Sequence, residues 1–312
     1  MNRIESYLSK QGFLILDGGL ATELEGRGFD LADSLWSARL LIESPAAIGA
    51  VHHDYLAAGA DVIITASYQA TIQGLMARGF SRANSAEIIQ SAVNIAIATR
   101  DQFWQSTQHT NRLRPLVAAS VGPYGAYLAN GAEYTGDYDL DRSGLRDFHR
   151  ERWQILANSG ADLLACETIP SLIEAQALLD LLHQSPDQTA WFSFSCRDGE
   201  HISDGTPILD CARLVENEAQ VAAIGVNCTP PEFIPSLIRI LRDATEKPIV
   251  VYPNSGEGWD AVHKCWVGVE GDSAEIYATD AQQWHKLGAT LIGGCCRTTP
   301  QYIRTIRNQH MV

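Results

Sequence analysis

A turn and a buried strand follow a helix end in Ser159-Gly160-Ala161-Asp162-Leu163-Leu164-Ala165-Cys166-Glu167-Thr168. The glycine is typical of a left-handed helix cap, and the apolar run after it is typical of a strand that is buried on both faces. Ala58-Gly59-Ala60-Asp61 and Leu287-Gly288-Ala289-Thr290 repeat the turn elsewhere in the chain. The sequence therefore predicts one helix-turn-strand unit that is used several times.

Short apolar runs of this kind recur eight times along the chain. They cover residues 14–19, 62–67, 116–122, 163–168, 191–196, 222–228, 249–254 and 290–296. Helical patterns lie between them, most clearly at residues 45–58, 85–104, 145–158, 171–183, 231–244 and 274–287. Because parallel strands need such long crossovers, the alternation predicts an α/β fold, a single-domain (β/α)₈ TIM barrel over residues 1–312.

Composition narrows the classes of function. The chain has 312 residues, 46% of them hydrophobic, which is enough for a large core. The first residues lack the apolar core of a secretory signal, and no apolar run reaches the roughly 20 residues that span a bilayer. We therefore expect a cytoplasmic protein with no membrane partner. A formal net charge of −14 argues against nucleic acid as a partner.

In a barrel of this class the active site forms at the C-terminal ends of the strands. Those ends are unusually rich in thiols, carboxylates, amides and glycines. They read Asp17-Gly18-Gly19, Thr65-Ala66-Ser67-Tyr68, Ser120-Val121-Gly122-Pro123, Cys166-Glu167-Thr168, Asn227-Cys228, Asn254-Ser255-Gly256 and Gly293-Gly294-Cys295-Cys296.

Three of the seven cysteines, Cys228, Cys295 and Cys296, fall at the ends of the sixth and eighth predicted strands. A reducing compartment keeps cysteines free, so metal binding or catalysis is a better reading than a disulfide framework. Thiolates suit zinc, and three protein ligands leave one position for water or substrate. Two alternatives stay open: the cysteines could be small buried residues or reactive thiols, or His149 or His263 could close a structural zinc site.

The same residues carry a resemblance to a known family. Gly225-Val226-Asn227-Cys228, followed by Gly293-Gly294-Cys295-Cys296-Arg297, resembles the two-part zinc signature of the homocysteine S-methyltransferase family. Residues 16–24 and 161–168 match as well, so the resemblance covers essentially the whole chain. It is closest to the bacterial enzymes that use S-methylmethionine, through residues 32–37, 65–70 and 120–128.

The resemblance implies one Zn²⁺ per chain, with Cys228, Cys295 and Cys296 as the ligands that activate the substrate thiol. The implied reaction is transfer of a methyl group from S-methylmethionine, or from S-adenosylmethionine, to the thiol of L-homocysteine, which forms methionine. Zinc favours the thiolate, the nucleophilic form, over the thiol. Asn254 would be the ligand in the resting enzyme, with a turn-stabilising asparagine as the alternative.

The resemblance also implies how the amino acid end of homocysteine is held. Asp17 and Glu167 would face the ammonium group. Backbone N–H groups around Gly18, Gly19 and Ser120 would be candidates for the carboxylate, and glycine permits such close backbone approach. The competing readings are tight turns for the glycines and structural hydrogen bonds for the carboxylates.

A methyl sulfonium donor is a cation, which favours aromatic faces and carboxylates in its pocket. By resemblance, Trp36 in the loop after the first strand is the best aromatic candidate. Tyr68 and Tyr124 are weaker candidates. Residues 124–138, which include Glu133, would form either a mobile cover or a packed surface loop.

Other functions remain to be weighed against this one. A zinc hydrolase would generally use histidine and carboxylate ligands, so three thiols argue against it. A non-catalytic zinc or thiol-binding protein, and a zinc methyltransferase that acts on another thiol, are the alternatives. Betaine use would call for a further C-terminal segment and cobalamin use for further domains, which we do not expect here. The sequence does not choose between the two sulfonium donors, and it predicts no oligomeric state.

Overall fold

The computed structural model describes residues 2–31, 36–106, 112–256, 258–260, 265–267 and 273–310. The strands of its main sheet are β1 (Leu14–Ile15), β2 (Val62–Ile64), β3 (Leu116–Val121), β4 (Leu163–Ile169), β5 (Ala190–Phe194), β6 (Val221–Asn227), β7 (Ile249–Tyr252) and β10 (Ala289–Ile292). A separate antiparallel hairpin, which the sequence did not suggest, pairs β8 (Gly258–Asp260) with β9 (Cys265–Val267).

Helices alternate with these strands. The α-helices are α1 (Arg3–Gln11), α2 (Leu20–Gly26), α3 (Leu40–Glu43), α4 (Pro45–Ala58), α5 (Ile72–Ala77), α6 (Arg82–Ser106), α7 (Tyr124–Leu128), α8 (Arg142–Ala157), α9 (Leu172–His183), α10 (Ile208–Val215), α11 (Ile234–Ala244), α12 (Ala274–Leu287) and α13 (Pro300–His310). Short 3₁₀ helices are η1 (Trp36–Arg39), η2 (Ala132–Tyr134) and η3 (Pro231–Phe233). Within the described ranges, none of the helices combines the length and the apolar character that a membrane crossing requires.

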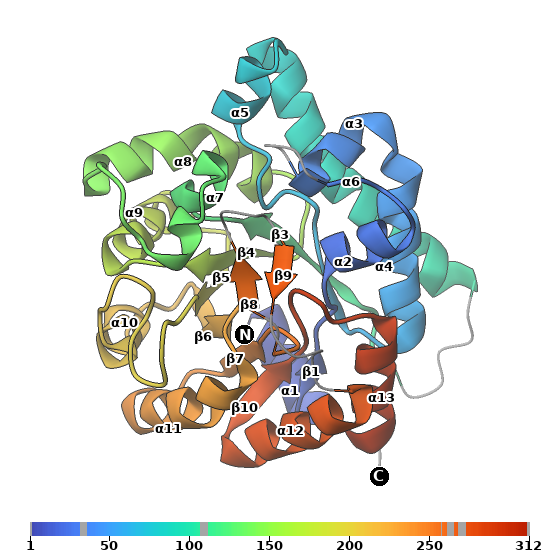
Figure 1. The fold of residues 1–312 in the computed structure, drawn as a ribbon, viewed down its shortest axis with the longest axis vertical. Helices are drawn as coiled ribbons and strands as arrows, with labels where there is room; N and C mark the ends of the chain where they lie inside the picture. Colours follow the sequence, from blue (N-terminus) through green and yellow to red (C-terminus); the bar gives the residue numbers. More distant parts are fainter. Residues whose placement is uncertain are drawn as a thin grey trace.

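The eight strands of the main sheet are parallel and follow the order β1-β10-β7-β6-β5-β4-β3-β2. A parallel bridge between Leu16 and Val62 joins the two ends of this order. The sheet therefore curls into a barrel, and Figure 1 shows α4, α6 and α8 to α13 arranged around it. The predicted (β/α)₈ barrel is confirmed.

The two faces of the sheet pack into two different apolar cores. Leu14 and Leu16 belong to a cluster inside the barrel, whereas Ile15 between them belongs to the larger cluster under the helices. Successive side chains of a strand point to opposite faces, so a strand that is buried on both faces must be apolar at every position. This explains why the strand sequences are continuous apolar runs.

The predicted glycine caps are largely confirmed. Gly59 (φ 116°) and Gly288 (φ 118°) end α4 and α12 in the left-handed conformation. Gly160 is also left-handed (φ 88°), but α8 has already ended at Ala157, so this glycine belongs to the turn that follows.

The last strand is shorter than the sequence suggested. β10 ends at Ile292, and Gly293 to Cys296 form a loop. A side chain at Gly293 would collide with Leu16, and one at Gly294 with Thr298. Close packing therefore requires glycine at both positions. Past the strand, the Gly294 N–H still donates to Asp17 O (3.0 Å) and the Cys295 N–H to Pro253 O (2.9 Å), and the chain turns at Cys296 and Arg297.

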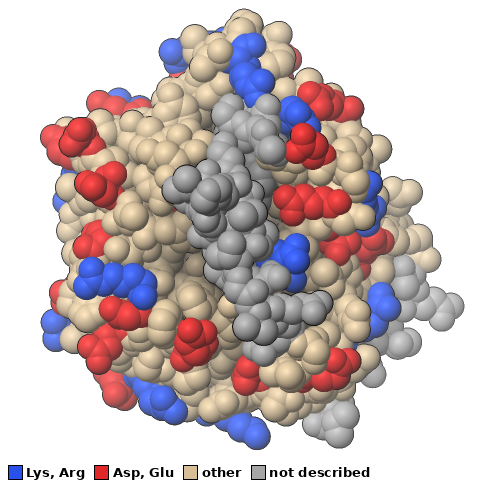
Figure 2. Space-filling view, in the orientation of Figure 1, with Lys and Arg blue, Asp and Glu red and all other residues tan. Residues whose placement is uncertain are grey.

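Charged side chains surround the face of the molecule that Figure 2 shows. Acidic and basic residues are interspersed around its rim, without a broad basic patch among the described residues of that face. On this face, negative charge is thus dispersed among positive charge.

Candidate active site

A pocket of about 450 Å³ opens at the C-terminal ends of the strands. We call its strand-end residues the floor: Asp17, Glu167, Thr168, Asn227, Cys228, Tyr252, Cys295 and Cys296. We call the lining residues from the helices and loops above the strands the wall: Glu25, Phe29, Asp30 and Leu31 in and after α2, and Ala129, Gly131, Glu133 and Tyr134 between α7 and α8. Among the described residues that line the pocket, several are carboxylates and none is a lysine or an arginine.

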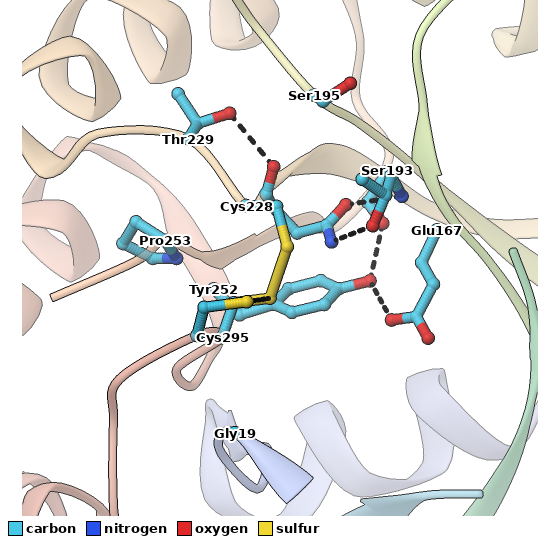
Figure 3. Close-up of a disulfide and its surroundings, with 12 residues drawn as sticks. Gly19, Glu167, Ser193, Ser195, Cys228, Thr229, Tyr252, Pro253 and Cys295 are labelled. Carbon is cyan, nitrogen blue, oxygen red and sulfur yellow. Dashed lines mark hydrogen bonds between the residues drawn. A yellow bond between two sulfur atoms is a disulfide. The ribbon is translucent and has the colours of Figure 1, made fainter. Parts of the chain in front are cut away.

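The three predicted cysteines lie together on the floor. The Sγ atoms of Cys228, Cys295 and Cys296 are all within 4.8 Å of one another, a group that can hold a metal ion. A disulfide joins Cys228 to Cys295, and Cys296 is a free thiol. Figure 3 shows this disulfide beside the ring of Tyr252. A sulfur atom in a disulfide is not a thiolate, so metal binding by all three cysteines requires the reduced form.

Backbone contacts between neighbouring loops hold the cysteines in place. The Cys295 N–H donates to Pro253 O (2.9 Å), and the Ser255 N–H donates to Cys296 O (3.2 Å). The Tyr277 hydroxyl lies between Pro253 O (3.1 Å) and Gly293 O (2.9 Å). These bonds join the loop after β7 to the loop after β10.

Cys228 itself has a left-handed backbone conformation, with φ 47°. Non-glycine residues rarely adopt it, and it costs about 1–3 kcal/mol where the surrounding structure enforces it. The Cys228 N–H donates to Tyr252 O (3.3 Å) on the neighbouring strand. The end of β6 thus turns its thiol toward the cysteines after β10.

Asn254 lies in the loop that pairs with Cys295 and Cys296. Its Oδ1 atom is buried and has no hydrogen-bond partner among the described residues, while its backbone N–H donates to Thr229 O (3.1 Å). An unsatisfied buried oxygen is costly unless a ligand completes it. The predicted role of Asn254 as an oxygen ligand fits this position and stays a prediction.

The two histidines considered as zinc ligands have different outcomes. His149 is fully buried, with Nε2 2.8 Å from Glu174 Oε1 and Nδ1 2.7 Å from Arg152. Both ring nitrogens are therefore engaged away from the cysteines, and the structure does not support His149 as a ligand. His263 lies outside the described residues.

Asp17 and Glu167 form a buried acidic pair on the floor, with 4% and 7% of their surfaces exposed. Asp17 accepts a hydrogen bond from the Ile64 N–H (2.8 Å). Glu167 accepts hydrogen bonds from the Ser120 hydroxyl and from the Tyr252 hydroxyl (3.1 Å). Figure 3 shows the bond from Tyr252.

Burial dominates the electrostatics of this pair. It raises the pKa of Asp17 well above its ordinary range, and it raises the pKa of Glu167 to about 7 although the hydrogen bonds from Ser120 and Tyr252 oppose the shift. The charged forms lack a cationic partner on the floor. A bound ammonium group would supply one.

Thr168, next to Glu167, has φ 58°, which is unusual for a β-branched residue. The Asn227 side chain compensates by accepting from the Thr168 N–H (2.7 Å) and donating to Thr168 Oγ1 (2.7 Å). Asn227 thereby ties the end of β4 to the end of β6. It links the acidic pair to the cysteine that follows Asn227.

The glycines predicted to bind the substrate carboxylate lie at the pocket, but one of their N–H groups already has a partner in the protein. Gly18 and Gly19 line the pocket, but the Gly19 N–H donates to Thr298 O (3.1 Å). A side chain at Gly18 would collide with Thr298 and Tyr55, and one at Gly19 with Thr22. Close packing alone therefore requires glycine at both positions.

Ser120 does not line the pocket, contrary to the expectation that its backbone contacts the substrate. It is fully buried, and its N–H donates to Thr65 Oγ1 (3.0 Å). The Ser120 hydroxyl donates to Glu167. Its place in this structure is behind the carboxylate, which it orients.

The aromatic residues predicted for the donor also differ in position. Tyr68 lines the pocket. Tyr124 is absent from the residues that line it and packs edge-on against Tyr138 and Phe148. The Trp36 side chain lies outside the part that the structure describes, so its role stays a prediction.

Glu133 and Tyr134 are pocket residues to which the sequence assigned no role. They lie on η2, which does not directly follow a strand in the sequence. The expectation that active-site residues follow strand ends therefore does not find them. Glu133 Oε2 is buried and has no hydrogen-bond partner among the described residues. Burial raises the pKa of the Glu133 carboxyl. Leaving such an atom unpaired costs about 1–3 kcal/mol.

A single carboxylate fastens both ends of the segment 124–138, which carries Glu133. The Tyr124 N–H donates to Glu174 Oε1 (2.6 Å), and the Tyr138 hydroxyl donates to Glu174 Oε2. Glu174 is fully buried at the start of α9. In the middle of the segment, the Ser195 hydroxyl donates to Glu133 O (2.9 Å). The segment is packed in this structure, and its role as a mobile cover stays a prediction.

Comparison with known proteins identifies the family of the chain. A family model described as homocysteine S-methyltransferase matches residues 14–310. The homocysteine S-methyltransferase YbgG of Bacillus subtilis is 52% identical over 307 residues, which are 98% of this chain and 97% of that relative. The homocysteine S-methyltransferase of Escherichia coli is 49% identical over 306 residues and is covered to 98%, as is this chain.

Solved structures show the same likeness. The homocysteine methyltransferase MmuM from Escherichia coli in its metallated form matches with a TM-score of 0.89 and 46% identity, over 99% of this chain and 100% of that one. Its oxidized form matches over the same shares with a TM-score of 0.90 and 46% identity. The match to the family extends over almost the whole barrel, cysteine loops included, and the chain belongs to the homocysteine S-methyltransferase family.

Proposed function

We propose that this protein transfers a methyl group from a sulfonium donor, S-methylmethionine or S-adenosylmethionine, to the thiol of L-homocysteine and so forms methionine. We further propose that Cys228, Cys295 and Cys296 hold one zinc ion per chain. The observation that carries the proposal is the convergence of three thiols and two buried carboxylates in one pocket. A thiol substrate that also carries an ammonium group has a partner for each end there.

The donor atoms of the floor fit zinc. Three thiolates are soft ligands of the kind that zinc prefers, and the unpaired Asn254 Oδ1 offers an oxygen close to the same loops. When bound, the metal would act as a Lewis acid that favours the thiolate form of the substrate at neutral pH. A metallated form of the Escherichia coli relative supports a metal in this family.

The chain's own residues would orient homocysteine. Asp17 and Glu167 would receive the ammonium group, because they lie buried without a cation and because charge-assisted hydrogen bonds are the strong ones. Ser120 and Tyr252 hold the Glu167 carboxylate from behind. Tyr252 thus connects the acidic pair to the cysteine side of the floor (Figure 3).

The lining of the pocket supports a cationic donor. Carboxylates are present and basic residues are absent among the described lining residues, while Phe29, Tyr68 and Tyr134 supply aromatic faces. A sulfonium group is attracted by both kinds of surface. S-Methylmethionine and S-adenosylmethionine share that group, and we place S-methylmethionine first because of the sequence likeness to enzymes that use it.

The test is an assay of methionine formation by purified protein that has been reduced and loaded with zinc. Homocysteine is supplied with S-methylmethionine, S-adenosylmethionine or betaine in separate reactions, beside a metal-stripped sample. We expect zinc-dependent product with a sulfonium donor. No product with any donor would refute the proposed reaction and favour another thiol acceptor.

The metal ligands are tested by Cys228→Ala with Cys211→Ala as the matched control. Cys211 is a buried cysteine of α10 that does not line the pocket. We expect Cys228→Ala to lose bound zinc and to lower kcat/KM by more than the roughly 100-fold that loss of an outer-shell metal partner costs. Equal zinc content and turnover in the two variants would remove Cys228 from the site.

A further inference from the structure

The pocket leaves one side free for the second substrate. The thiols and the acidic pair occupy the floor, which the proposed function assigns to homocysteine. The donor must then lie against the wall, which is formed by residues in and after α2 and by residues between α7 and α8. A charge on the wall that has no partner in the protein is a candidate for recognition of the donor.

Three carboxylates of the wall differ in how free they are to recognise a ligand. Glu25 and Asp30 are exposed, so water and salt screen them. Glu25 also has the guanidinium of Arg297 as a neighbouring positive charge. Glu133 is different, because its Oε2 atom is buried and has no hydrogen-bond partner in the described part of the chain.

The backbone around Glu133 is held firmly in place. The Ser195 hydroxyl donates to Glu133 O (2.9 Å), and a side chain at Gly125 would come within 2.4 Å of Glu133 N. The segment is thus packed tightly against α7 at this point. An unpaired carboxylate oxygen on a fixed backbone is pre-organised to meet a ligand, since little ordering remains to be done on binding.

Aromatic surface lies next to this carboxylate. Tyr134 follows it on η2, and Tyr68 lines the same pocket; the charge of Glu133 acts on the hydroxyls of both. A carboxylate beside aromatic faces is a suitable environment for a soft organic cation. The donors of the proposed reaction carry such a cation, both on the sulfonium sulfur and on the amino group.

We propose that Glu133 is a specificity-determining residue that recognises the positive charge of the sulfonium methyl donor from the wall of the pocket. The inference rests on the proposed function and deepens it, because it divides the acidic residues of the pocket between the two substrates. Asp17 and Glu167 serve homocysteine, and Glu133 serves the donor.

The experiment compares Glu133→Gln with Glu25→Gln in zinc-loaded, reduced protein, with S-methylmethionine and homocysteine varied in turn. Glutamine keeps the size of the side chain and removes its charge. We expect Glu133→Gln to raise KM for S-methylmethionine roughly tenfold or more, with KM for homocysteine unchanged within about twofold. Glu25→Gln should raise KM for S-methylmethionine by less than Glu133→Gln does, because the charge of Glu25 is exposed and has Arg297 as a neighbouring positive charge.

A structural role for Glu133 makes different predictions. If the side chain only supported the segment, Glu133→Gln would lower the melting temperature or affect both substrates alike, and Glu133→Asp would do the same. Under the proposal, Glu133→Asp keeps the charge and recovers part of the donor KM. Melting curves and bound zinc are measured for each variant.

The outcomes separate this inference from the proposed function. Active wild-type protein with an unchanged donor KM in Glu133→Gln overturns the role of Glu133 and leaves the reaction intact. An equal rise of the donor KM in Glu25→Gln also overturns it, because any negative charge near the mouth would then suffice. Wild-type protein that makes no methionine from either sulfonium donor overturns both.

Discussion

The floor and the wall of the pocket are built in opposite ways. The floor consists of strand ends, and its acidic groups are already hydrogen-bonded: Asp17 to the Ile64 N–H, and Glu167 to Ser120 and Tyr252. The wall consists of short helices and loops, and its half-buried Glu133 has one buried carboxylate oxygen without a partner in the described residues. The floor is therefore fixed before substrate arrives, whereas the wall is completed by what binds.

This difference suggests that the floor and the wall bind different substrates. Side chains on rigid barrel strands suit the substrate that the reaction always uses, because they fix its geometry. Loops tolerate change without cost to the barrel, so they suit the substrate that can differ between related enzymes. The proposed acceptor lies on the floor and the proposed donor lies against the wall.

The largest expected effect concerns the stability of the floor. Burial raises the pKa of Glu167 from an ordinary value of 4.5 to about 7. Between these values the folded state binds more protons than the unfolded state, so the free energy of unfolding falls as pH rises through this range. In metal-free, reduced protein without substrate, we expect a loss of about 3 kcal/mol by pH 8 relative to Glu167→Gln. Chemical denaturation across the pH range measures it.

A wild-type stability curve that runs parallel to that of Glu167→Gln would mean that Glu167 does not carry this cost. The charged carboxylates of the floor would then cost the folded protein no more free energy than those of the wall. The Glu167 charge is also one cause of the raised pKa of Asp17, so the comparison measures Glu167 together with its coupling to Asp17.

The next effect concerns binding to the floor. We expect Glu167→Gln to raise KM for homocysteine by roughly 10- to 100-fold, because a charge-assisted hydrogen bond contributes about 1.5–3 kcal/mol. KM for S-methylmethionine should stay unchanged. Steady-state kinetics with each substrate varied in turn gives both constants. A rise confined to the donor would reverse the assignment of floor and wall.

The smallest effect concerns how the wall is held. Glu174→Gln keeps one carbonyl acceptor but removes the charge that fastens Tyr124 and Tyr138. We expect KM for the donor to rise about threefold to tenfold, because Glu174 does not line the pocket and reaches it through the position of the segment; the variant also weakens the bond to His149, so its melting temperature is measured too. KM for homocysteine should not change.

Asp180→Asn on the same helix is the matched control for Glu174→Gln, since Asp180 pairs with Arg142 at the surface. Both variants remove one negative charge from α9. If the control shifts the donor KM equally, the helix as a whole and not the bonds to Tyr124 and Tyr138 sets the position of the wall.

The floor could be predicted from the sequence because strand ends converge by geometry. Asp17, Glu167 and Cys228 each end or follow a strand, and the barrel brings them into one pocket whatever the loops do. The two cysteines after β10 were expected at the end of the strand itself. They lie just beyond β10, in a segment whose backbone still bonds to the chain after β1 and after β7.

The wall could not be predicted, because it depends on contacts between distant parts of the chain. Glu174 on α9 fixes the segment from Tyr124 to Tyr138, and Ser195 after β5 holds its middle. No periodicity or motif encodes such pairs. Ser120 shows the same limit on the floor: its position at a strand end was evident, but the contact that makes it a support for Glu167 depends on the packing of β3 against β4.

The attachment of the segment 124–138 to Glu174 has a practical consequence for protein engineering. Both ends of this segment bond to the same carboxylate on α9, so its two junctions lie close together. Such a segment is suited to replacement as one unit. Whole segments from related enzymes could be exchanged at Tyr124 and Tyr138 while the barrel and its cysteines stay untouched. Such chimaeras would transplant donor preference as a unit.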